Sequence, residues 1–107
     1  MTLAEWLATR FPAPPPALRD RLGDLLATRG EEDASAAPDA CLDAAEELLA
    51  SLLRDGCTSR ASALDLLAVD ALVTYAFEAA AAEPGSLDDR AGRAMARVSA
   101  AATVPAA

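Results

Sequence analysis

The chain has 107 residues and a formal net charge of −8, and 53% of its residues are hydrophobic although only 4% are aromatic. This length is that of one ordinary domain. The sequence contains no His, Lys, Asn or Gln. It therefore excludes imidazole acid–base catalysis, Lys Schiff bases, the phosphate-loop Lys and metal sites built on His.

The acidic charge also bears on partners and location. It repels phosphate backbones and anionic lipid, so we expect no nucleic-acid partner and no membrane partner, whereas a cationic or protein partner is compatible with it. The first residues lack a positively charged start, and Glu5 and Arg10 interrupt the apolar stretch that a secretory signal needs. A cytoplasmic location is the resulting expectation.

Alanine and leucine, with 29 and 16 residues, dominate the sequence and predict an all-α fold. Apolar residues recur at helical spacing in five segments, which proline, glycine or polar residues separate. We expect one domain over residues 1–107. It should be a compact bundle of about five helices, with a mostly apolar central helix over about residues 59–83.

The N-terminal segment carries clear start and stop signals. Thr2 and Glu5 have the spacing of a capping box. A first helix is expected over residues 1–11, with Phe11 extending its apolar stripe. The proline-rich stretch 12–16 should end this helix and form a stiff connector.

Two helices should follow, separated by a loop. The second is expected over residues 16–29, where Gly23 costs about 1 kcal/mol relative to alanine unless a neighbour packs closely against it. Residues 30–38 are acidic and rich in small side chains, which predicts an exposed loop. The third helix should cover about residues 38–55.

The C-terminal half should contain the central helix and one more. Asp65 lies outside the polar sector of the central helix, so it needs a buried partner or a gap at the edge of the bundle. The last helix is expected from residue 87, and the alanine-rich tail 102–107 should fray.

Two cysteines lie at opposite ends of the third helix. At 1.5 Å per residue, Cys41 and Cys57 would be about 24 Å apart, too far for a disulfide. We expect one small core residue and one loop or cap residue rather than a redox pair.

Carboxylates recur along one side of the third helix, at Asp39, Asp43 and Glu47. One interpretation is a solvated helix face, which we favour. The alternative is a divalent-metal site shared with the central helix. Its candidate ligands are Asp39, Asp43, Asp70 and Glu78.

The last helix carries a basic stripe formed by Arg90, Arg93 and Arg97. Its guanidinium groups could bind a phosphate-bearing ligand. We favour ion pairs instead, between Asp89 and Arg93 and with the acidic side of the third helix, within one chain or across a dimer.

Taken together, these features favour a non-enzymatic accessory module without a cofactor, which binds another protein or forms a homodimer. Trp6 is expected to anchor the core, or to serve as an interface residue if the first helix packs loosely. The candidate contact residues are Trp6, Phe11, Arg90, Arg93 and Arg97.

Residues 67–78, Leu-Ala-Val-Asp-Ala-Leu-Val-Thr-Tyr-Ala-Phe-Glu, resemble a helix of trans-polyprenyl diphosphate synthases that reads similarly around a Gly-Asp-Ala-Leu segment. Val69 replaces the glycine of that family, and neither of its aspartate-rich magnesium motifs occurs in the sequence. The resemblance implies, as the alternative function, a degenerate relative that binds a divalent metal or a diphosphate. No catalytic residue of that family is assigned to a position of this sequence.

Overall fold

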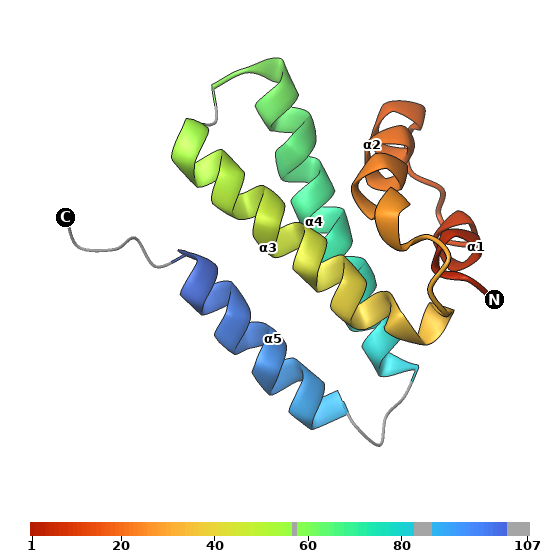
Figure 1. The fold of residues 1–107 in the computed structure, drawn as a ribbon. Helices are drawn as coiled ribbons and strands as arrows, with labels where there is room; N and C mark the ends of the chain where they lie inside the picture. Colours follow the sequence, from red (N-terminus) through yellow and green to blue (C-terminus); the bar gives the residue numbers. More distant parts are fainter. Residues whose placement is uncertain (57, 83–86, 103–107) are drawn as a thin grey trace.

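A computed structural model describes residues 1–56, 58–82 and 87–102. Within these residues the α-helices are α1 (Leu3–Ala8), α2 (Pro16–Leu26), α3 (Ala37–Asp55), α4 (Arg60–Ala81) and α5 (Leu87–Ala102), shown in Figure 1. Two short 3-10 helices, η1 (Ala27–Arg29) and η2 (Ala34–Ala36), lie between α2 and α3. The predicted all-α fold of about five helices is confirmed.

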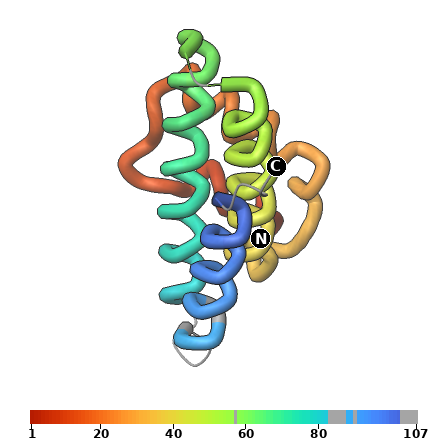
Figure 2. Tube along the Cα trace, turned by 90° about the vertical axis from the view of Figure 1, so that its left-hand side faces the viewer, coloured from red at the N-terminus to blue at the C-terminus, as the bar shows by residue number. Residues whose placement is uncertain are grey.

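The helices form three layers. α3 and α4 make a central antiparallel pair, with α1 and α2 on one side and α5 on the other (Figures 1 and 2). α4 contacts α2, α3 and α5, which confirms its central position. In Figure 2, α5 covers the lower part of the α3–α4 pair, and the upper turns of both helices extend past its end.

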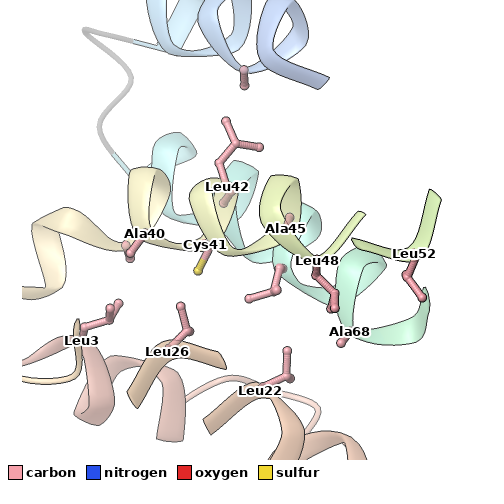
Figure 3. Close-up of a cluster of buried hydrophobic side chains, with 14 residues drawn as sticks. Leu3, Leu22, Leu26, Ala40, Cys41, Leu42, Ala45, Leu48, Leu52 and Ala68 are labelled. Atoms are coloured by element: carbon pink, nitrogen blue, oxygen red, sulfur yellow. The ribbon is translucent and has the colours of Figure 1, made fainter. Parts of the chain in front are cut away.

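The core is built from leucine and alanine. Leu3, Leu22, Leu72 and Cys41 are the largest fully buried side chains, and Figure 3 shows Leu3 and Leu22 reaching up from the α1–α2 layer toward α3. Buried alanines of α3 and α4 separate the leucines, so the two helices pack at short distance.

α4 is apolar on nearly all sides, but its buried stripe is narrow. The stripe consists of Ala68, Leu72, Ala76 and Ala80, spaced by four residues. Leu66, Leu67 and Phe77 of the same helix are exposed. The expected central helix therefore leaves large apolar side chains at the surface.

The capping box at the start of α1 is confirmed. The Thr2 backbone N–H donates to Glu5 Oε2 at 2.8 Å, and the Glu5 backbone N–H donates to Thr2 Oγ1 at 3.2 Å. These two bonds satisfy amide groups that have no partner within the helix.

The expected extent of the first helix, residues 1–11, was wrong at its end. α1 ends at Ala8, and Thr9 caps its last turn. Phe11 precedes Pro12, and a residue before proline avoids the helical conformation. The Phe11 side chain therefore leaves the apolar stripe and is 94% exposed.

The expectation of an exposed loop over residues 30–38 was also wrong in part. η2 lies within this segment, and Pro38 is buried in the first turn of α3. The Leu3 backbone N–H donates to the Glu32 carbonyl oxygen at 2.7 Å. This segment thus supplies acceptors for the free N–H groups at the start of α1.

Asp65 has the partner that its position requires. Arg21 Nε of α2 donates to Asp65 Oδ1 of α4 at 2.7 Å, and both side chains are about one-third exposed or less.

Gly56 ends α3 at the expected place with a φ of 86°, which a glycine adopts without strain. Within the described residues, no helix has the length and apolar character needed to cross a membrane.

The Gly23→Ala variant is expected to be more stable than the wild type by about 0.5–1 kcal/mol. Gly23 lies in the middle of α2, and a Cβ atom there would meet nothing within 4 Å. Chemical denaturation monitored by circular dichroism measures the difference. A loss of stability would show that the glycine has a role that its surroundings do not reveal.

Candidate functional site

A cleft of about 440 Å³ lies where α3, α4 and α5 meet. Its apolar lining comes from all three helices, and its charged lining from α3, α5 and the end of η1. The charged residues are Arg29, Asp39, Asp43, Arg93 and Arg97. The apolar residues are Pro38, Leu42, Ala76, Phe77, Ala80, Ala91 and Ala94.

An ion-pair network joins α5 to α3 at one wall of the cleft. Arg97 donates from Nη2 to Glu46 Oε2 at 2.7 Å and also to Asp43. Arg29 donates from Nη1 to the other carboxylate oxygen of Asp43 at 2.7 Å. The expected pairing of the basic stripe with the acidic side of the third helix is thus confirmed for Arg97.

The network sets the protonation of Asp43. Burial raises the pKa of the Asp43 carboxyl, but hydrogen bonds from Arg97 and Arg29 outweigh this effect and hold the pKa below its usual value. The same bonds raise the pKa of Arg97. Asp43 is therefore ionised wherever the protein is folded at neutral pH.

The Asp43→Asn variant is expected to be less stable than the wild type at pH 7 by about 0.5–1 kcal/mol. Because the folded-state pKa of Asp43 is lowered, its contribution is present above the unfolded-state pKa of about 3.9 and is lost as the pH falls through the folded value. The unfolding free energy of the wild type should therefore fall more steeply below pH 4 than that of the variant.

Urea denaturation between pH 7 and pH 3 measures both effects. Glu47→Gln is the matched control on the same helix, because Glu47 is exposed, lies beyond the first turn where the helix dipole acts, and forms no ion pair with any described residue. The control should keep the wild-type stability at pH 7. Equal slopes for wild type and Asp43→Asn would contradict the role given to the network.

Arg93 differs from Arg97. It lies exposed at the cleft, and it forms no ion pair with a described residue, so the expected pair with Asp89 is not formed there. The side chain of Arg90 lies outside the described residues. Of the basic stripe, Arg97 is thus held in the ion-pair network, whereas Arg93 has no ion pair with a described residue.

The four candidate metal ligands are not brought together. Asp39 and Asp43 line the cleft, whereas Glu78 lies beside Arg10, with 3.7 Å between Oε2 and Arg10 Nη1. Within residues 1–56, 58–82 and 87–102, no group of three His, Cys, Asp or Glu side chains could hold a metal ion.

Trp6 packs against α4 as a partly buried anchor. Its ring meets that of Tyr75 edge to face, with centroids 6.3 Å apart, and the Arg10 guanidinium lies 4.0 Å from the Trp6 ring centroid. Of the two aromatic residues expected to contact a partner, only Phe11 has a side chain that is almost fully exposed.

Cys41 is a core residue, as expected. Burial raises the pKa of its thiol to about 12, so it stays protonated and unreactive at neutral pH. Cys57 lies outside the described residues.

Several large apolar side chains lie exposed on α4 and α5. We call Leu66, Val73, Phe77, Met95 and Val98 the apolar strip. Val73 and Val98 line one small hollow between the helices, and Phe77 and Met95 lie one turn from them on the same faces. Met95 is 67% exposed, and all the others except Val73 are more than one-third exposed.

Sequence reasoning missed two features of this region. Arg29 was not singled out, because nothing in the sequence links the end of the second helix to Asp43. The exposure of Phe77 and Met95 was also not predicted, because apolar residues at helical spacing usually face a core. Their exposure depends on how far α5 covers α4, which periodicity does not encode.

Comparison of the chain with protein-family models, curated proteins and solved structures found no match. The resemblance of residues 67–78 to a helix of trans-polyprenyl diphosphate synthases therefore has no support from a family model.

Proposed function

We propose that this protein is a non-enzymatic interaction module, and that its apolar strip contacts a partner protein with a basic surface. The observation that carries the proposal is the exposure of Met95, Val98, Phe77 and Leu66 on adjoining helices. Exposed apolar patches rimmed by polar residues are typical of protein contact sites. The absence of catalytic activity is proposed from the residue types that the sequence lacks.

Charge supports a basic partner. Asp70 lies one turn from Leu66 on α4, and Asp88 lies two turns before Met95 on α5. Both carboxylates are exposed and without an ion pair to a described residue. An amphipathic helix with apolar residues on one face and arginines at its edges would cover the strip and reach both.

The same charge disfavours a homodimer, the other form of interaction expected from the sequence. A second copy would bring a second net charge of −8 and would oppose acids to acids at the edges of the strip. These acidic residues attract a basic partner, whereas they repel a second copy of the same acidic chain.

Calorimetric titration with a synthetic amphipathic peptide, with leucines on one face and arginines on the other, tests the proposal. We expect binding that weakens with added salt. The double variant Met95→Ser/Val98→Ser should weaken it at least about tenfold, because both substitutions remove apolar contact area. A peptide with glutamates in place of arginines should bind more weakly.

Phe11→Ser is the matched control, because Phe11 is an exposed apolar residue in the connector between α1 and α2. It should leave peptide binding unchanged. Binding that survives the double variant, or that is lost in Phe11→Ser, would overturn the proposal. So would a dimer in light scattering that the double variant dissociates, because a second copy would then occupy the strip.

A further inference from the structure

The arginines at the cleft differ in how many of their donors are already used. Arg29 donates from Nε and Nη2 to Glu32 and from Nη1 to Asp43, so all three nitrogens are occupied. Arg97 uses Nε and Nη2 for the carboxylates of α3. Both Arg93 and Arg97 line the cleft, and neither the guanidinium of Arg93 nor Nη1 of Arg97 forms a hydrogen bond with a described residue.

The floor of the cleft is apolar and built from small side chains. Four alanines of α4 and α5, together with Leu42 and Phe77, form it. A hollow of about 440 Å³ with an apolar floor and charged walls has the size of a small-molecule site, for which about 300–1,000 Å³ is usual.

The charge of the lining indicates the sign and size of the ligand's charge. Carboxylates of Glu32, Asp43 and Glu46 already balance Arg29 and Arg97, so Arg93 is the one arginine of the lining that forms no ion pair with a described residue. One free guanidinium matches one carboxylate through two parallel hydrogen bonds. A diphosphate brings more negative charge than this lining offsets, and the rest of the protein repels it.

We propose that the cleft binds a small apolar monocarboxylate, with its carboxylate on Arg93 and Nη1 of Arg97 and its apolar body on the alanine floor. This site lies on the side of α5 that faces α3. It shares Phe77 with the apolar strip but does not include Met95 or Val98. An apolar amine is the competing ligand, because Asp39 on the opposite wall forms no ion pair with a described residue.

Calorimetric titrations at pH 7 with octanoate, octanol, octylamine and pyrophosphate separate the possibilities. Octanoate should bind most tightly of the four. Arg93→Gln should weaken octanoate at least about tenfold, because it removes the charge-assisted bonds. The matched control is Arg19→Gln on α2, an exposed arginine in the opposite layer, which should leave the affinity within about twofold.

A second variant tests the apolar half of the site without changing charge. Ala91→Leu places a larger side chain on the cleft floor, and it should abolish octanoate binding while the melting temperature stays at or above that of the wild type. Octanoate binding retained in Ala91→Leu or in Arg93→Gln would overturn the proposal. Octanol, octylamine or pyrophosphate binding at least as tightly as octanoate would do the same. The interaction at Met95 and Val98 is tested with other variants, so the two proposals fail separately.

Discussion

Replacing Leu72 with alanine is expected to lower the free energy of unfolding by about 3 kcal/mol. Leu72 is 0% exposed and lies in the middle of the buried stripe of α4. The substitution removes buried apolar surface and leaves a cavity that neighbouring helices fill only in part. Urea denaturation followed by circular dichroism measures the loss.

The matched control is Leu67→Ala on the same helix. Leu67 is 56% exposed, so the same chemical change should cost less than about 1 kcal/mol. Similar losses for the two variants would show that the buried stripe of α4 does not face the core as the structure places it.

Replacing the buried Ala68 with the larger leucine should also destabilise the protein. Ala68 is fully buried on α4, where its small side chain permits close packing with neighbouring helices. Ala68→Leu must displace them and is expected to cost about 2 kcal/mol. Ala63→Leu, at an exposed position of α4, is the control and should leave the unfolding free energy nearly unchanged. Thermal and urea unfolding of the two variants compare them directly.

The helix starts and stops could be predicted because the signals that set them are local. The capping box of Thr2 and Glu5 and the left-handed glycine at position 56 act within one turn of the helices they limit. The end of α1 could not be placed, because the helix ends at Ala8, before the proline expected to stop it, where Thr9 and Arg10 donate to the Trp6 carbonyl oxygen. The hydrogen bond between the backbones of Leu3 and Glu32 does not depend on residue type, so it could not be predicted from the sequence. Residues 30–38 therefore had the composition of an exposed loop.

The candidate site was predictable only in its electrostatics. Opposite charges on two helices indicated that Arg97 would meet the acids of α3. That the partners are Asp43 and Glu46 depends on how α5 docks. The cleft beside them arises because alanines of α4 and α5 face each other, and a sequence does not show which small residues meet across a helix interface.

The exposed apolar strip is the central claim, and chemical-shift mapping by NMR tests it most directly. The protein labelled with ¹⁵N is titrated with the leucine–arginine peptide, and the amide shifts are assigned. Our account predicts the largest shifts at residues 66–77 of α4 and 95–98 of α5. Largest shifts around Phe11 and α1, or no shifts at saturating peptide, would contradict it.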